Sequence, residues 1–195
     1  MSFESGTGSH GQKGAVLHRV NPCGQPPQEG PFLQKGLRPG RRIGTMEKKG
    51  ALPLKLLISA CLLGCCCRYD GASKPQPWVE ELAQKHILIP VCPEQMGGLP
   101  TPRTPSERVG DRVLMKDGTD VTAQYRRGAE EALRLYGLFG CEAALLKARS
   151  PSCGVGAIYD GSFSGTLIPG DGVTAELLKR HGIPVFTEEN MGELI

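Results

Sequence analysis

Short apolar runs recur along the chain from about residue 54, and each is shorter than most helices. They are Leu54 to Ala60 (LKLLISA), Ile87 to Val91, Ala143 to Lys147 and Ile183 to Phe186. A nearly continuous apolar run of four to eight residues is typical of a strand that is buried on both faces of a parallel sheet. The pattern therefore predicts about four buried strands.

Helix-like stretches separate these runs. Trp78 to Lys85 and Val173 to Arg180 predict two short helices, and Val121 to Tyr136 predicts a longer one that Asp120 can cap. Residues 93–111 are rich in proline and glycine and predict a long ordered loop. Because strands and helices alternate, we predict an α/β fold with a small, open, Rossmann-like parallel sheet flanked by helices.

The first fifty residues differ in composition from the rest of the chain. They hold ten glycines and five prolines, and no apolar period is sustained there. Such a segment cannot bury enough apolar surface to offset the entropy lost on ordering, so we predict a disordered extension over residues 1–50. Residues 51–195 then form a single α/β domain. Met46 lies just before the change, which suggests a translation start there as an alternative.

Length and composition limit the classes of protein to which the chain can belong. Its 195 residues are 39% hydrophobic and 22% charged, which is enough for one domain with its own core. No segment reaches the roughly 18 consecutive apolar residues of a membrane span, and the N-terminus has no apolar stretch like that of a signal peptide. We therefore expect a cytoplasmic protein.

The net charge of +3 is unevenly distributed. Residues 1–50 hold eight Lys and Arg against three Asp and Glu, whereas the remainder holds fifteen against seventeen. A faintly acidic domain does not present the surface that neutralises a phosphate backbone. Nucleic-acid binding is therefore a poor first interpretation of the folded part.

The chain contains eight cysteines, which in a cytosolic protein favour thiolate chemistry or metal binding over a disulfide framework. Cys61 follows the first predicted strand, Cys92 ends the second, and Cys153 lies in the loop after the third. Because the carboxyl ends of parallel strands border one crevice, we expect these three thiols to converge. The paired spacings of common structural zinc sites are absent.

Small and turn-forming residues flank each of the three cysteines, in the segments CLLG (61–64), CPEQMGG (92–98) and SPSCG (150–154). Backbone amides exposed by such loops are what an iron-sulfur site uses to tune itself. Three protein ligands would leave one iron open, and an open iron is a Lewis acid. The pattern therefore indicates a catalytic centre more than an electron store.

Several multi-residue motifs occur from about Leu54 to the C-terminus. They are SACLLG (59–64), RYDG (68–71), CPEQMGGLPTPR (92–103), DGTDVT (117–122), KARSPSCG (147–154), IYDGSFSG (158–165) and GDGVTAELL (170–178). In identity and order they resemble a family of short bacterial proteins whose characterised members are thiouracil desulfidases.

The resemblance implies a 4Fe-4S cluster held by Cys61, Cys92 and Cys153, with the unligated iron binding the sulfur of a thiocarbonyl substrate. It also implies acid-base and activating roles for Glu94 and Ser150. The activity it implies is a non-redox desulfidase acting on a small thiolated pyrimidine base or nucleoside such as 2-thiouracil. In such a reaction water attacks the ring carbon and a carboxylate relays protons.

Cys65, Cys66 and Cys67 are the main departure from the family pattern. Any of them reaching the fourth iron would close the site and leave a passive cluster. Two alternatives therefore stay open: a non-catalytic metal- or cluster-binding protein, and cluster-dependent sulfur transfer to a nucleobase or a transfer RNA.

Two other residues, Arg103 and Lys147, have competing interpretations. Arg103 and Lys147 could contact the substrate or could form ion pairs with Asp70 or Asp120. Cys141 is expected to pack as a small apolar residue.

Overall fold

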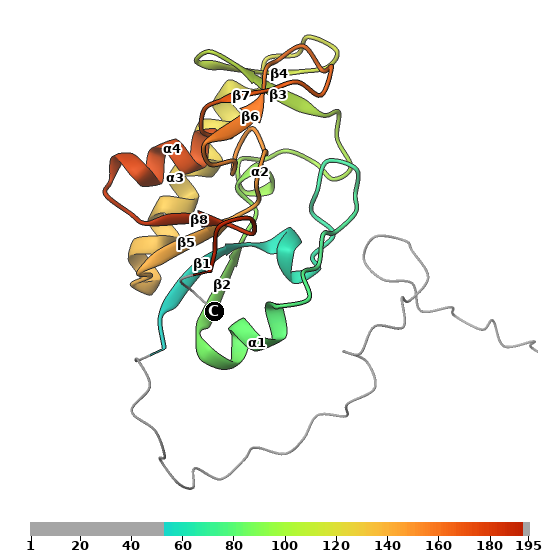
Figure 1. The fold of residues 1–195 in the computed structure, drawn as a ribbon. Helices are drawn as coiled ribbons and strands as arrows, with labels where there is room; N and C mark the ends of the chain where they lie inside the picture. Colours follow the sequence, from blue (N-terminus) through green and yellow to red (C-terminus); the bar gives the residue numbers. More distant parts are fainter. Residues whose placement is uncertain (1–52, 193–195) are drawn as a thin grey trace, which may run out of the picture. The chain divides into compact units, whose positions relative to one another are not determined.

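The computed structural model describes residues 53–192. They form a four-stranded parallel sheet with strand order β2-β1-β5-β8, flanked by helices and joined by two small hairpins (Figure 1). This arrangement confirms the predicted α/β fold with a small open parallel sheet. The predicted extension over residues 1–50, including Met46, lies outside the described residues.

The strands of the sheet fall on the four predicted apolar runs. They are β1 (Lys55–Ser59), β2 (Ile87–Val91), β5 (Ala143–Leu146) and β8 (Val185–Thr187). The helices are η2 (Ala60–Leu63), α1 (Val79–Lys85), α2 (Pro93–Met96), α3 (Thr122–Phe139) and α4 (Val173–Arg180). Strand β8 begins two residues later than predicted, directly after Pro184, which has no N–H to donate to a strand ladder.

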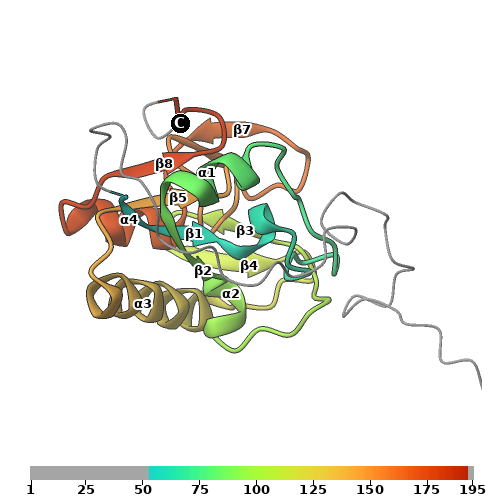
Figure 2. The ribbon, with the colours of Figure 1, turned by 90° about the horizontal axis from the view of Figure 1, so that it is seen from below.

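Both faces of the sheet are covered, which explains why its strands read as continuous apolar runs. Leu56 and Ile58 of β1 point to one face and pack in a cluster with residues of α1 and η2. Leu57 points to the other face, where its cluster includes residues of α3 and α4. In Figure 2, strands β1 and β2 lie between α1 and α3. Cys141 is buried in the second cluster, as expected.

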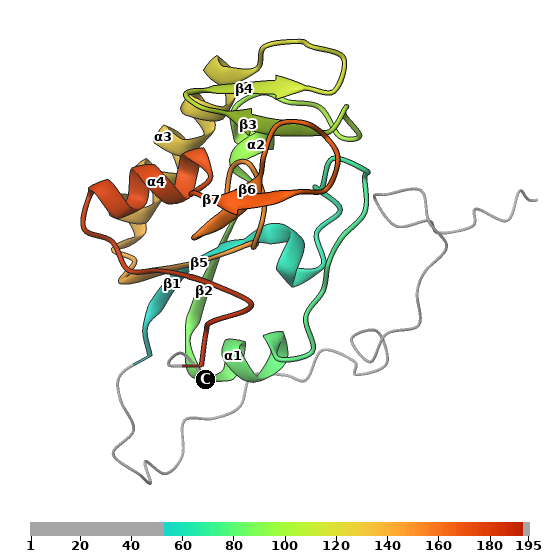
Figure 3. The ribbon, with the colours of Figure 1, turned by 45° about the horizontal axis from the view of Figure 1, so that its top comes forward.

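The prediction of a loop over residues 93–111 was wrong, because α2 and strand β3 (Ser106–Val109) lie within it. Strand β3 forms an antiparallel hairpin with β4 (Arg112–Met115), and β6 (Ala157–Tyr159) pairs with β7 (Leu167–Pro169). Figure 3 shows both hairpins on the same side of the four-stranded sheet. These elements are three or four residues long, so their sequences are too short to show a period.

No helix among the described residues is both long and apolar enough to cross a lipid bilayer. The expected cytoplasmic location stays a prediction.

Helix α2 crosses α3 at two glycines whose backbones touch the opposite helix. A Cβ atom on Gly128 would lie 1.9 Å from the carbonyl oxygen of Pro93, and one on Gly97 would lie 2.0 Å from that of Gln124. Real Cβ atoms do not approach so closely, so only glycine permits this crossing. The crossing fixes α2, and with it Glu94, against the long helix.

We expect Gly128→Ala to destabilise the domain by about 3 kcal/mol, since the added methyl group meets backbone that cannot move aside. Gly137→Ala in the same helix is the matched control. Nothing lies within 4 Å of its added Cβ, so the higher helix propensity of alanine should stabilise the protein by about 0.5 to 1 kcal/mol. Urea unfolding measures both, and equal stability of the two variants would contradict the close crossing.

Candidate functional site

Strand β1 pairs with β2 along one edge and with β5 along the other, so the connections that follow β1 and β2 lead to opposite sides of the sheet. In open parallel sheets such a switch point leaves a crevice beyond the carboxyl ends of the strands, where ligands bind. A cavity of about 730 Å³ lies at this place. Its lining comes from the segments that follow β1, β2 and β5 and from both hairpins.

All five predicted site residues line this cavity. Cys61 lies in η2 directly after β1, Cys92 stands between β2 and α2, and Cys153 lies in the turn after β5. Glu94 is in α2, and Ser150 precedes Cys153 by three residues. The structure therefore brings together the three cysteines that the strand-end argument selected and the two residues that the family resemblance implied. Their roles as ligands and catalysts stay predictions.

The turn that carries Cys153 is bonded to the start of α4. The N–H groups of Gly172, Val173 and Thr174 donate to carbonyl oxygens of residues 151–154 at 2.8 to 2.9 Å. The first N–H groups of a helix have no partner within the helix, so this turn satisfies them. The Ser152 and Thr174 hydroxyls add a buried hydrogen bond of 2.8 Å. Helix α4 thus holds Cys153 in place.

Their surroundings make Cys92 and Cys153 difficult to ionise. Burial raises the pKa of Cys153 to about 12. The pKa of Cys92 is also raised, first by a hydrogen bond with Cys67 and then by burial. Adjacent thiolates would repel one another without a cation between them, whereas a coordinating metal holds thiols deprotonated. This set of thiols therefore fits a metal centre.

Cys67 is a fourth thiol of the cavity, and the sequence alone did not distinguish it from its neighbours. Among Cys65, Cys66 and Cys67, it is the one that lines the cavity. A hydrogen bond with Cys61, together with burial, raises the pKa of Cys67 to about 12, although Cys92 acts in the opposite direction. Cys65 is exposed.

The donor set fits an iron-sulfur cluster. Among residues 53–192, no three Cys, His, Asp or Glu side chains surround a point at which one metal ion could bind. In an iron-sulfur cluster, by contrast, each thiolate binds a different iron, so the sulfurs stand apart around a shared volume. Cys61, Cys92 and Cys153 come from three separate loops around one cavity, as a cluster requires.

Arg103 holds the carboxylate of Glu94. Oε2 of Glu94 accepts from Nε of Arg103 at 2.8 Å and from Nη2 at 2.6 Å, and the Arg103 side chain is only 3% exposed. Burial acts to lower the pKa of Arg103, but the charge and the hydrogen bonds of Glu94, with smaller contributions from Cys92 and Tyr125, together outweigh burial and raise the pKa. An ion pair of Arg103 with Asp70 or Asp120 was therefore the wrong alternative.

Ser150 lies between Glu94 and the Cys153 turn. Its Oγ accepts from the N–H groups of Ser152 and Cys153, both at 3.1 Å. With these two acceptor positions used, the hydroxyl hydrogen is left for Oε1 of Glu94, which lies 3.5 Å away. Oε2 of Glu94 is thus bound by Arg103, and Oε1 lies beside the hydroxyl of Ser150.

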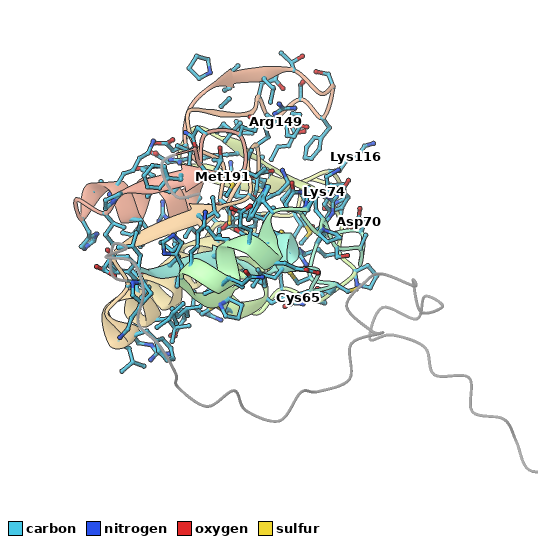
Figure 4. The ribbon with its side chains drawn as sticks, turned by 60° about the horizontal axis from the view of Figure 1, so that its bottom comes forward. Cys65, Asp70, Lys74, Lys116, Arg149 and Met191 are labelled. Carbon is cyan, nitrogen blue, oxygen red and sulfur yellow. The ribbon has the colours of Figure 1, made fainter. Side chains whose placement is uncertain are left out.

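Three lysines belong to the lining of the cavity. Lys147 forms an ion pair with Glu188, and not with Asp70 or Asp120 as considered above. Lys74 and Lys116 also belong to the lining and are exposed. Figure 4 shows these two lysines on the same side of the domain.

Two further lining residues escaped the sequence analysis. Phe163 and Arg149 are the two non-glycine residues with positive φ in the described part of the chain, at 57° and 62°. Glu107, which is buried, accepts from the N–H groups of Gly161 and Phe163 at 2.9 and 3.0 Å and so fixes the β6–β7 loop. Strained residues cluster at functional sites, but only tertiary contacts reveal them.

Comparison with known proteins was made for the whole chain. The model of the family described as 2-thiouracil desulfurase matches residues 56–190. The chain belongs to the 2-thiouracil desulfurase family. This finding confirms the resemblance that the motifs indicated.

Two relatives align with this desulfurase-family chain over almost their whole length. Uncharacterized protein YbbK of Bacillus subtilis is 37% identical over 150 residues, which cover 72% of this chain and 99% of YbbK. The solved structure of a [4Fe-4S]-dependent thiouracil desulfidase, TudS, is 50% identical, with a TM-score of 0.69. That match covers 72% of this chain and 95% of TudS.

We expect Arg103→Met to destabilise this desulfurase-family protein by about 3 kcal/mol, because it leaves the Glu94 carboxylate without its buried partner. Arg112→Met is the control. It removes an exposed ion pair with Asp120, at 2.9 Å, and should leave stability close to that of the wild type. Urea unfolding under anaerobic conditions compares them. Equal losses of stability in the two variants would contradict a larger contribution of the buried Glu94–Arg103 pair.

Proposed function

We propose that the protein is a 4Fe-4S-dependent desulfidase that removes the sulfur of a thiocarbonyl group from a thiolated pyrimidine base or nucleoside. The observation that carries the proposal is the meeting of Cys61, Cys92 and Cys153 with Glu94 and Ser150 on one cavity. Membership of the 2-thiouracil desulfurase family and the cofactor named for TudS support it.

Cys61, Cys92 and Cys153 are the proposed ligands of the cluster. A cluster bound through three thiolates supplies one iron that is free to bind sulfur and to act as a Lewis acid. The side chains of Ser59 and Ser152 lie beside the sulfur of Cys153, where hydrogen bonds from them act to lower its pKa. Hydrogen bonds of this kind tune the electron density of a ligand sulfur.

Glu94 and Ser150 are the proposed proton-handling residues. Arg103 occupies Oε2 of Glu94, so Oε1 is the oxygen that can accept a proton from an attacking water, with Ser150 Oγ beside it. Replacing C=S by C=O with the oxygen of water leaves the sulfur at the oxidation level of sulfide, with no net transfer of electrons. The proposed reaction is therefore a non-redox hydrolysis.

The size of the cavity favours a small substrate. At about 730 Å³ it lies within the roughly 300 to 1,000 Å³ of ligand pockets in general. A pyrimidine base or nucleoside fits this range. Sulfur transfer to a transfer RNA, the alternative with a large partner, has no comparable support.

A specific observation favours one other candidate, a closed and non-catalytic cluster. Cys67 lies close enough to Cys61 and Cys92 to hydrogen-bond with them. If Cys67 were a fourth ligand, no iron would be left open for a substrate. The two candidates differ in what removal of Cys67 does to the cluster and to turnover.

Iron and acid-labile sulfide after anaerobic reconstitution test the ligands. We expect about four of each per chain, lost in Cys61→Ala, Cys92→Ala and Cys153→Ala. Cys67→Ala should retain them, as should Cys141→Ala, the control for a buried cysteine elsewhere in the core. Loss of the cluster in Cys67→Ala, together with an inactive wild type, would instead identify the closed cluster.

Turnover of 2-thiouracil tests the role of Glu94. We expect Glu94→Gln to lower kcat by about 100-fold to 10,000-fold, the usual contribution of a general acid or base. Its iron content should not change, because Glu94 is not a proposed ligand. Glu80→Gln on α1, an exposed residue that does not line the cavity, should behave as the wild type. Wild-type kcat in Glu94→Gln would contradict the assignment.

A further inference from the structure

Ser106, at the start of β3, is a buried polar residue whose hydroxyl is left unsatisfied. The residue is only 9% exposed, and it belongs to the lining of the cavity. Within the described part of the chain, its Oγ has no hydrogen bond of good geometry, although the hydroxyl of Tyr125 lies close enough to interact with it. Buried hydroxyl groups are almost always bonded, so an exception on the wall of a ligand cavity points to a ligand.

A second hydroxyl lies beside it. Tyr125 of α3 is 2% exposed and lines the same cavity, and its hydroxyl neighbours Ser106 and the carboxylate of Glu94. Burial, and then the charge of Glu94, raise the pKa of Tyr125 well above its usual range, so the phenol stays neutral. Ser106 and Tyr125 therefore form a neutral polar wall that continues from the proposed proton-handling residue.

Several charged groups of the lining already have partners. Arg68 is paired with Asp70 at 3.0 Å, Arg149 is paired with Glu189 at 2.6 Å, and Lys147 is paired with Glu188. The hydroxyl of Ser106 differs from them because it can form a new hydrogen bond without giving up one of good geometry. A hydroxyl can donate to a carbonyl oxygen and can also accept from a ring N–H.

The chemistry of the substrate class matches this wall. In 2-thiouracil the sulfur is on ring carbon 2, and a second polar group, the carbonyl oxygen, is on ring carbon 4. A ring whose sulfur faces the cysteines places that oxygen elsewhere in the cavity, where it needs a donor. We propose that Ser106, with Tyr125 behind it, binds the ring carbonyl and selects substrates that carry it. This inference rests on the proposed desulfidase function.

Two substrates separate a binding role from a structural one. Pyrimidine-2-thione keeps the thiocarbonyl group of 2-thiouracil but lacks the oxygen on ring carbon 4. We expect Ser106→Ala to lower kcat/KM for 2-thiouracil about tenfold, mainly through KM, and to change the value for pyrimidine-2-thione less than about twofold. Ser106→Thr, which keeps a hydroxyl, should restore most of the preference.

Two measurements do not depend on turnover. Calorimetric titration with uracil, which carries the ring oxygen and cannot be desulfurised, should show about tenfold weaker binding to Ser106→Ala than to the wild type. The thermal midpoint of Ser106→Ala should stay at or above that of the wild type, because no protein hydrogen bond of good geometry is lost. A lowered midpoint combined with equal losses on both thio-substrates would mean that Ser106 is merely structural.

Failure of this inference can be distinguished from failure of the proposed function. A wild type that holds a full cluster but turns over neither thio-substrate contradicts the desulfidase function itself. An active wild type, with unchanged kcat/KM and unchanged uracil binding in Ser106→Ala, contradicts only the role of Ser106.

Discussion

The burial of β1 on both faces and both edges is the constraint on which the rest of the structure depends. Leu56, Leu57 and Ile58 are inaccessible to solvent, and β2 and β5 pair with the strand on either side. The centre of such a strand has no free surface, so polar and reactive groups can gather only beyond its ends. Ser59 marks the carboxyl end, with its buried Oγ accepting from the N–H of Lys147 at 3.0 Å. That bond ties together the ends of β1 and β5, after which Cys61 and Cys153 follow.

Three separate supports act on the site from that edge. Helix α4 satisfies its first N–H groups on the Cys153 turn, the glycine crossing fixes α2 against α3, and Arg103 binds Glu94. Arg103 also donates to the carbonyl oxygen of Cys67 at 3.1 Å, so one guanidinium joins the loop after β1 to the segment after β2. A positioned carboxylate beside a cluster of thiols is what proton transfer at a bound substrate needs, because geometry precedes pKa in general acid-base catalysis.

The two small hairpins add side chains to the lining of the cavity, beyond the carboxyl edge of the sheet. Strand β3 contributes Ser106 and Glu107 to the cavity, and the β6–β7 loop contributes Phe163. The carboxylate of Glu107 joins these hairpins through its bonds to Gly161 and Phe163. In families that share a fold and a centre, such added walls decide which substrate is accepted, since the fold alone does not. The proposed cluster ligands lie at the carboxyl edge of the sheet, whereas Ser106, which we propose selects the substrate, lies on a hairpin.

The sequence by itself determined the four strands, the three longer helices and the placement of Cys61, Cys92 and Cys153 after strands. These features depend on local hydrophobic pattern and on the rule that parallel strands share a carboxyl edge. The same information could not show α2, the hairpins, the partner of Arg103 or the difference between Cys65 and Cys67. Each of these was decided by the tertiary structure, because it depends on contacts between segments far apart in sequence: Gly128 with Pro93, Glu107 with Phe163, and Cys67 with Cys92. A local pattern reports how a segment divides its faces between core and solvent, but not which distant side chain it will meet.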